Sequence, residues 1–292
     1  MITVDMFAGV GGGSEGALRA GAEVAVALNH WQWVVDAHAA NHPGIRHECQ
    51  DLRQFNYSSL PDFDLLIGGF SCQGHSAAAN GARKANPKVD EHHDDLRANA
   101  WTVTQCLEIK RPLAYVCENV KDFLIWESKA DRALRRKRKI SGWGAYFKHW
   151  LESIRIRGYT TQVLILRAWD FGVPQRRDRV FVVGRRDGKT IDVAPTSPGE
   201  IPVGPWLDLG EQGLRWRSID RRGPVLNRIA RSRRRLIAAG EDGCRFLTQH
   251  TRDHMGLSIA SQSIRTITTK DQWALVDGDR YRPLTIRENV RL

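Results

Sequence analysis

One cysteine stands in a sequence setting that favours reactivity. Cys72 follows the short apolar run 63–67 and lies within the glycine-rich segment GGFSCQG at 68–74. A thiol on a glycine-flanked loop at a strand end is more exposed than a core cysteine, and nearby N–H groups and basic residues lower its pKa toward the thiolate. Cys72 is therefore a candidate nucleophile.

A carboxylate and two arginines also stand at the ends of apolar runs. Glu118 ends one such run, where a buried partner can keep a carboxyl group protonated or ion-paired for acid–base work. Arg177 and Arg179 precede another run, and residues spaced by two project to the same side of an extended chain. Taken singly, a strand-end glutamate is often a capping group and an arginine pair is often a solvated edge.

A glycine-rich turn follows the first apolar run. Residues 2–8 lead into GVGGG at 9–13, and helical composition starts at Glu15. Such a turn lets the backbone approach a ligand, and the helix offers unpaired N–H groups to an anionic moiety. This predicts a site for a nucleotide-like cofactor, with a turn that binds nothing as the alternative. Ser14 stands where the dinucleotide fingerprint has its third glycine, which disfavours a nicotinamide enzyme.

The elements that must position these groups alternate along the chain. The β-like runs are 2–8, 23–28, 63–67, 113–117, 162–166 and 180–183. Their alternation with helical stretches predicts an α/β fold with a mostly parallel sheet that is covered on both faces. Ligands of such sheets bind at the carboxyl ends of the strands, where the glycine turn, Cys72 and Glu118 fall.

The sequence changes in texture along its length. Residues 1–186 form the predicted cofactor-binding domain, 187–258 are rich in proline and arginine with weak periodicity, and 259–292 are expected to return to the first domain. Lys and Arg number 44 against 33 Asp and Glu, a net charge of +11 that favours a polyanionic partner. Basic residues cluster at 132–139 and 228–235, for which solvated helix faces are the alternative.

Other classes of protein are disfavoured by composition. No run approaches the roughly 20 apolar residues of a membrane span, and the start lacks the features of a secretory signal, so no membrane association and a cytoplasmic location are expected. The 5 cysteines include no Cys-x-x-Cys pair and no histidine partners at zinc spacing, so neither a disulfide scaffold nor a metal is expected. Cys106 and Cys117 are predicted to be buried apolar residues.

Taken together, these segments resemble the DNA cytosine-5 methyltransferase family. The shared segments, in order along the chain, are DMFAGVGG at 5–12, GGxxCQG at 68–74, ENV at 118–120, QxRxR at 175–179 and RTIT at 265–268. The resemblance implies a Rossmann-like, mostly parallel sheet of the S-adenosylmethionine-dependent methyltransferase type. It also implies that 187–258 is a small, irregular target-recognition domain.

The resemblance implies a reaction and assigns its catalytic residues. Cys72 would add to carbon 6 of cytosine, because carbon 5 becomes nucleophilic only in the resulting enamine. Glu118 would protonate ring nitrogen 3 from a dry pocket, Arg177 would hold the exocyclic oxygen, and Arg179 would support that pair. The expected activity is transfer of a methyl group from S-adenosylmethionine, leaving S-adenosylhomocysteine, to a cytosine flipped out of duplex DNA.

Binding residues follow from the same resemblance. The expected cofactor residues are Asp5, Phe7, Gly9, Gly11, Gly12, Asn29, Asp51 and Leu52. The expected substrate residues are Ser71, Gln73, Asn119, Gln175 and Thr268. Phe7 would lie near the adenine, Asp51 would accept from its amino group, and Asn29 stands where the family usually has an acid that grips the ribose.

Three departures from the family pattern leave alternatives open. Ser71 replaces the proline that usually precedes the nucleophile, so transfer of a different group to the same carbon is an alternative. The sequence ends at Leu292 without the Gly-Asn-Ala-Val-Pro segment, which fits a truncated form, a second chain that supplies the segment, or a partly open pocket. The recognition domain is short, which predicts a short target sequence.

Several functions therefore compete. The leading one is a DNA methyltransferase that acts as a restriction partner, in phage self-protection or as an orphan modifier. A tRNA cytosine-5 methyltransferase and a catalytically impaired DNA-binding module are the alternatives.

Overall fold

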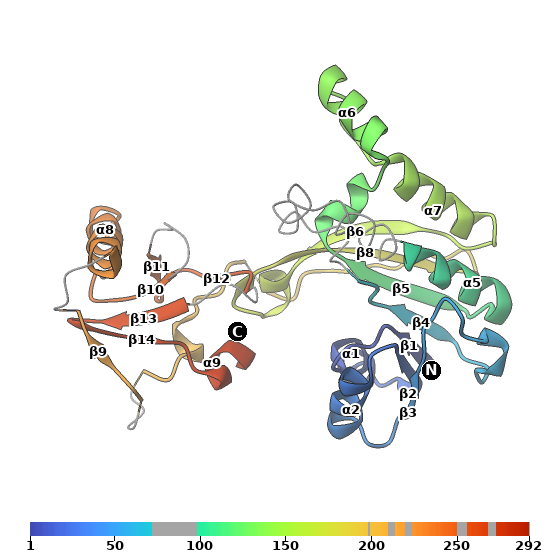
Figure 1. Cartoon of the computed structure of the whole chain (residues 1–292), viewed down its shortest axis with the longest axis horizontal. Helices are drawn as coiled ribbons and strands as arrows, with labels where there is room; N and C mark the ends of the chain where they lie inside the picture. The colour runs from blue at the N-terminus through green and yellow to red at the C-terminus, as the bar shows by residue number, and fades with distance from the viewer. Residues whose placement is uncertain are drawn as a thin grey trace. The chain divides into compact units, whose positions relative to one another are not determined.

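The computed structural model consists of two compact units (Figure 1). It describes residues 1–71, 98–197, 199–209, 214–219, 224–249, 256–267 and 273–291. Unit 1 comprises Met1–Leu166 and Arg179–Val193, and unit 2 comprises Arg167–Asp178 and Ala194–Leu292.

Unit 1 contains a sheet whose seven described strands have the order β3-β2-β1-β4-β5-β8-β6. Its strands are β1 (Ile2–Met6), β2 (Glu23–Asn29), β3 (Arg46–Cys49), β4 (Leu65–Gly68), β5 (Ala114–Asn119), β6 (Gln162–Arg167) and β8 (Asp178–Arg185). The pairs β1–β2, β1–β4, β2–β3 and β4–β5 are parallel, and β5–β8 is antiparallel. The predicted mostly parallel α/β sheet is confirmed. Only β3 escaped prediction, because its residues, RHEC, carry no apolar pattern.

Helices cover both faces of this sheet. They are α1 (Gly12–Arg19), α2 (Gln32–Asn41), α5 (Ala100–Lys110) and α7 (Ala145–Arg155), with 3-10 turns η1 (Tyr57–Ser59) and η3 (Lys121–Ile125). Helix α6 (Lys129–Arg138) projects away from the sheet (Figure 1). Val24 and Ala27 of β2 pack in a cluster of small residues with Ala17 of α1, whereas Val26 and Leu28 belong to the larger core that includes α5 and α7. No helix in the described part of the chain is long and apolar enough to span a membrane.

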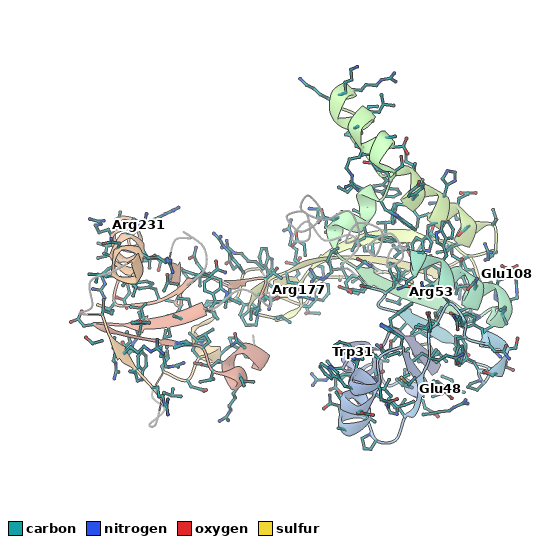
Figure 2. The ribbon with its side chains drawn as sticks, viewed as in Figure 1. Trp31, Glu48, Arg53, Glu108, Arg177 and Arg231 are labelled. Atoms are coloured by element: carbon teal, nitrogen blue, oxygen red, sulfur yellow. The ribbon has the colours of Figure 1, made fainter. Side chains whose placement is uncertain are left out.

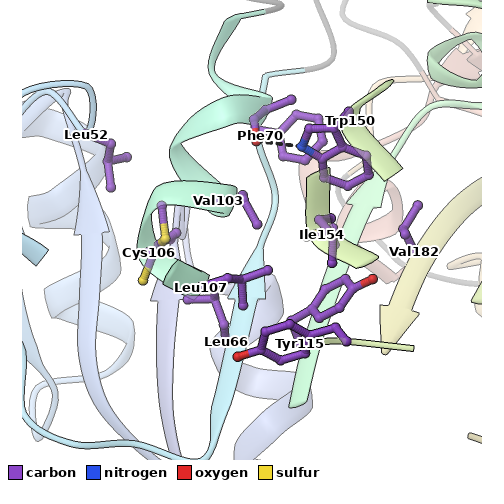
Figure 3. Packing of buried hydrophobic residues seen from close by; sticks show 14 of the residues in the cluster. Leu52, Leu66, Phe70, Val103, Cys106, Leu107, Tyr115, Trp150, Ile154 and Val182 are labelled. Carbon is purple, nitrogen blue, oxygen red and sulfur yellow. Dashed lines mark hydrogen bonds between the residues drawn. The ribbon is translucent and has the colours of Figure 1, made fainter. Parts of the chain in front are cut away.

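The larger core is rich in aromatic side chains (Figure 3). Trp150 of α7 is buried and donates from Nε1 to the carbonyl oxygen of Ala100 at 2.8 Å, which ties α7 to α5. Phe70, just after β4, packs edge-on against Trp150 and Phe123. Because burying one such ring contributes about 2 to 3 kcal/mol, the chain is held firmly up to the residue before Ser71.

Unit 2 is mostly β structure. It contains a five-stranded sheet in the order β11-β10-β13-β14-β9 and a two-stranded β12-β7 pair among its described residues. Its strands are β7 (Gln175–Arg176), β9 (Arg217–Ser218), β10 (Arg245–Gln249), β11 (Leu257–Ser258), β12 (Ile264–Arg265), β13 (Trp273–Asp277) and β14 (Arg280–Pro283). Its helical segments are η4 (Ala168–Phe171), η5 (Gly204–Trp206), α8 (Pro224–Ala238) and α9 (Ile286–Arg291).

The two units differ from the predicted domain boundaries. The segment 167–178 groups with unit 2, and 259–292 also lies there instead of returning to the first domain. The reason is that β13 is buried along most of its length and pairs with β10 on one side and β14 on the other. The functional names given to the domains stay predictions.

Candidate active site

The glycine-rich turn joins β1 to α1 in unit 1. Gly9 and Gly11 have φ angles of 57° and 109°, a region that favours glycine. A Cβ on Gly11 would come within 2.5 Å of the His42 ring, so the position has no room for a side chain. A Cβ on Gly12 would have no neighbour within 4 Å, which leaves that side of the turn open. The backbone at the start of α1 is therefore accessible to a ligand.

Asp5 lies beneath this turn and not on its open side. Its side chain is only 1% exposed, and a Cβ on Gly13 would approach its Oδ2 to 2.9 Å. The Ser14 hydroxyl donates to Oδ2 at 2.8 Å. Burial raises the pKa of Asp5 to about 6, against the weaker opposing effect of Ser14. Asp5 thus supports the turn from below, and its expected contact with the cofactor stays a prediction.

A histidine pair extends this buried array. His38 Nε2 lies 3.1 Å from Ser14 Oγ, and His38 Nδ1 lies 2.8 Å from His47 Nε2. His38 is buried, and burial lowers its pKa to about 4, with further lowering by the neighbouring rings of His47 and His42. Sequence reasoning missed the array because its members stand on β1, α1, α2 and β3. No local pattern joins them.

The other expected cofactor residues have different surroundings. Phe7 packs edge-on against Phe70, with ring centroids 6.4 Å apart. Asn29 Oδ1 accepts from the Trp31 N–H at 3.3 Å. Asp51 accepts from the Arg53 guanidinium at 2.6 Å, and that hydrogen bond holds the pKa of Asp51 below its usual value.

Leu52 was also expected to bind the cofactor, and that role stays a prediction. Its side chain is buried in the hydrophobic core, and its carbonyl oxygen accepts from the Tyr57 hydroxyl at 2.7 Å. The side chain is therefore unable to face a ligand on the open side of the turn.

Trp31 is a residue that sequence reasoning missed at this edge. It follows the carboxyl end of β2 and is 53% exposed (Figure 2), with its ring centroid 4.9 Å from that of Trp33. An exposed indole offers a flat apolar surface to a planar ring. The signal in the sequence was the pair Trp31 and Trp33, which closely follows a β-like run. Large aromatic residues at that position do not fit an apolar helix stripe, which indicates a surface role.

The end of β5 carries the predicted carboxylate. Glu118 Oε1 accepts from Arg179 Nε at 2.8 Å across the antiparallel β5–β8 pair, in which Glu118 stands opposite Phe181. The Glu118 side chain is 38% exposed, so the described residues alone do not form the dry pocket predicted around it. Arg179 meets Glu118 as expected, and the catalytic roles of both stay predictions.

Asn119 links this edge to the loop that leads toward Cys72. Its side chain is buried, Nδ2 donates to the Phe70 carbonyl oxygen at 3.1 Å, and Oδ1 accepts from the Val120 N–H at 2.8 Å. Both ends of the amide thus bond within the protein. The structure gives this expected substrate residue a positioning contact. Ser71 is half-buried directly beyond Phe70.

The remaining site predictions fall elsewhere. Cys72, Gln73 and Thr268 lie outside the described residues. Arg177 (Figure 2) and Gln175 belong to unit 2, and Gln175 is buried. The approach of Arg177 to Glu118 and the substrate contact of Gln175 stay predictions.

The described cysteines clarify which thiols are reactive. Cys106 and Cys117 are buried, as predicted, and burial raises the pKa of Cys106 to about 12 and that of Cys117 as well. Neither forms a thiolate at neutral pH. Cys49 and Cys244 are exposed and free. Within the described ranges, no group of three His, Cys, Asp or Glu could hold a metal ion.

A mostly parallel sheet with an open glycine turn at one strand end and an acid–guanidinium pair at another places the chain in the class of α/β proteins whose polar groups gather at the carboxyl ends of the strands. Within that class, the chain belongs to the C-5 cytosine-specific DNA methylase family, whose sequence profile matches residues 1–208.

Individual relatives agree with this family. The chain is 29% identical to the type II methyltransferase M.NgoBI of Neisseria gonorrhoeae, over 63% of this chain and 50% of the relative. It is 31% identical to the type II methylase M.HgiEI of Herpetosiphon aurantiacus, over 62% of this chain and 36% of the relative. The match thus spans half or less of the length of these relatives.

A solved structure shares the fold. It is a candidate DNA modification methyltransferase encoded within a prophage of E. coli, which superposes with a TM-score of 0.53 at 23% identity. The superposition covers 78% of this chain and 64% of that chain.

Proposed function

We propose that this protein transfers a methyl group from S-adenosylmethionine to carbon 5 of a cytosine flipped out of duplex DNA. The carrying observation is the Glu118–Arg179 pair at the carboxyl end of β5, in the unit that also holds the open glycine turn. Membership of the C-5 cytosine-specific family supports cytosine as the target, and the type II methyltransferase relatives support DNA as the substrate.

The proposed reaction passes through a covalent adduct between Cys72 and the cytosine ring. The Cys72 thiolate adds to carbon 6, and Glu118 delivers a proton to ring nitrogen 3, so the electron pair of the ring becomes available at carbon 5. S-adenosylmethionine, when bound, supplies the methyl group. A water molecule then takes the carbon 5 proton, the Cys72 sulfur leaves as the thiolate, and nitrogen 3 returns its proton to Glu118, which restores the aromatic ring.

Positioning groups serve this chemistry. Arg179 holds the Glu118 carboxyl group at the strand end, and Asn119 fixes the Phe70 carbonyl two residues before the nucleophile. The entering base excludes water from the partly exposed Glu118 side chain, and this provides the dry surroundings that proton transfer requires. Arg177 supplies a guanidinium to the exocyclic oxygen of the base.

The cofactor-side residues fit S-adenosylmethionine. The open face at Gly12 admits a ligand against the backbone, and the exposed Trp31 ring suits the adenine face. Asp51 keeps its charge beside Arg53 and has further lone pairs for an amino group.

The test is transfer of a labelled methyl group to duplex DNA, with the product base identified by mass. The Cys72→Ser variant is expected to fall to background, because a hydroxyl is far less nucleophilic than a thiolate at neutral pH. The Cys49→Ser variant is the matched control, since Cys49 is an exposed cysteine of β3, and it should retain full activity.

Two results would overturn the proposal. One is undiminished transfer by Cys72→Ser, and the other is tRNA displacing duplex DNA as the preferred acceptor in a competition assay. A product mass other than that of 5-methylcytosine would show that a group other than methyl is transferred.

A further inference from the structure

An excursion of unit 1 leaves the sheet shortly after Glu118 and carries helix α6 (Figure 1). Its base is closed by backbone hydrogen bonds, from the Gly144 N–H to Leu124 at 2.8 Å and from the N–H groups of Tyr146 and Phe147 to Trp126 at 3.1 and 3.2 Å. Phe147 and Trp126 are buried. The excursion 127–143 therefore stands on a fixed base in the core.

Local contacts within the excursion hold its shape. The Ser128 hydroxyl accepts from the Asp131 N–H at 3.0 Å and donates to its carboxylate at 2.7 Å, which caps α6. Arg135 pairs with the buried Glu127 at 2.9 Å and donates to the carbonyl oxygens of Gly142 and Trp143. Both acidic residues of the excursion are thus occupied internally.

The charge that remains is strongly positive. Residues 127–143 contain 7 Lys and Arg against 2 Asp and Glu. Lys137, Arg138 and Lys139, here called the α6 tip, are all exposed, and none of the three forms an ion pair within the described part of the chain. Three consecutive cations at an exposed end of a helix repel one another. A polyanion would relieve that repulsion.

Packing does not account for α6. Leu134, the one large apolar residue of α6, is 43% exposed, and Ile140 just beyond the helix is 51% exposed, so the helix has no apolar stripe in a core. The second basic run differs, because on α8 Arg228 and Arg233 donate to the carbonyl oxygens of Gln249 and Gly243 and so tie that helix to unit 2. Within the described ranges, the α6 tip makes no such side-chain contacts with the rest of unit 1.

We propose that the α6 tip is a phosphate-binding arm that contacts the backbone of duplex DNA, on the same unit that carries Glu118. This rests on the proposed function in so far as the duplex is the substrate. Its contacts are to phosphates, so they would add affinity and orientation without reading sequence. An anionic membrane fits less well, because an interfacial helix needs a broad apolar face and α6 has Leu134 as its one large apolar residue.

The test removes the three charges and measures salt dependence. Wild type and the triple variant K137Q/R138Q/K139Q are titrated into a labelled duplex without methyl donor, at several salt concentrations. The slope of log affinity against log salt should fall by about 0.9 per lost phosphate contact, hence by about 2.7 in the triple variant, with at least about a 10-fold loss of affinity at low salt. The single variant R138Q should lose about 0.9.

A matched control removes the same charge from other parts of unit 1. The triple variant R19Q/R46Q/K189Q changes exposed residues on or after α1, β3 and β8. It should leave the slope unchanged. Circular dichroism checks that each variant keeps its helices, and glutamine has nearly the helix propensity of lysine and arginine.

Three results would overturn the arm. They are an unchanged slope in the tip variant, an equal loss in the control, and a tip-dependent binding to phosphatidylserine vesicles with unaltered duplex binding. Failure of the proposed function is separate, because it shows as absent methyl transfer by wild type while the binding slopes still respond to the tip.

Discussion

Two carboxylates of the same sheet have opposite surroundings. Asp5 on β1 is 1% exposed and meets a hydroxyl, whereas Glu118 on β5 is 38% exposed and meets a guanidinium at 2.8 Å. Both strands run parallel to β4, which lies between them. The difference teaches that a strand-end acid acquires its role from its partners and its burial. Asp5 supports the glycine turn, and Glu118 stays partly exposed to solvent.

The largest expected effect separates the two acids by activity. Glu118→Gln removes the transferable proton and should lower single-turnover methyl transfer by about 10²- to 10⁴-fold. Asp5→Asn keeps the shape of the buried side chain and should cost less than about 10-fold, because Asp5 touches no open face of the site. Rapid-quench measurements at saturating donor and duplex provide the comparison. Equal losses in both variants would abolish the distinction.

The next effect concerns the proton held by the buried array. With the pKa of Asp5 near 6 and that of His38 near 4, the folded pair holds one proton between about pH 4 and 6, on Asp5. The unfolded pair also holds one, on His38, since the ordinary values are 3.8 and 6.5. In wild type, the pH dependence that Asp5 gives to the free energy of unfolding therefore cancels the pH dependence that His38 gives it between about pH 4 and 6.

Single variants should expose each half with opposite sign. In His38→Gln, the raised pKa of Asp5 contributes stability below pH 3.8 that is lost as pH rises through about 6. In Asp5→Asn, the lowered pKa of His38 contributes stability above pH 6.5 that is lost as pH falls through about 4. Each contribution is about 3 kcal/mol.

Urea unfolding across this pH range measures the effect. Burial is the main cause of both shifts, so each should survive loss of the other residue. His42 and His47, which face His38, remain in both variants and cancel from the comparison. Stability that changes with pH in the same direction in both variants would contradict the shared proton.

The hydroxyl between the two groups has a smaller effect. Ser14→Ala removes the partner of Asp5 Oδ2 and of His38 Nε2, and should lower the free energy of unfolding by about 1 to 3 kcal/mol. Ser59→Ala is the matched control, because that exposed hydroxyl bonds to a backbone carbonyl oxygen and its loss should stay within about 0.5 kcal/mol. Denaturant midpoints at neutral pH measure both variants. Equal losses of stability would show that the buried Asp5–Ser14–His38 array contributes no more than an exposed hydroxyl.

The sequence predicted the elements better than the contacts between them. Apolar runs located β1, β2, β4, β5, β6 and β8, and the glycine turn located the start of α1. The Ser14–His38 contact spans 24 positions, and the choice of β10 over the first sheet as the partner of β13 is a tertiary one. Neither leaves a periodic signal. Strand ends and residue spacing singled out Glu118 and Arg179 one by one, and their contact was expected only from the family resemblance.

A third acid at the sheet edge gives the smallest expected effect. Asp51 pairs with Arg53 on the surface, and exposed pairs contribute only about 0.2 to 1 kcal/mol, so Arg53→Gln should barely change the free energy of unfolding. Its loss also frees the pKa of Asp51 to rise toward 3.8, which leaves the carboxylate charged at neutral pH. Affinity for S-adenosylmethionine, measured by calorimetry, should therefore change less than about 5-fold. A larger loss would mean that Arg53 contacts the methyl donor itself. The acid–guanidinium pair after β3 would then serve ligand binding, as is proposed for the Glu118–Arg179 pair.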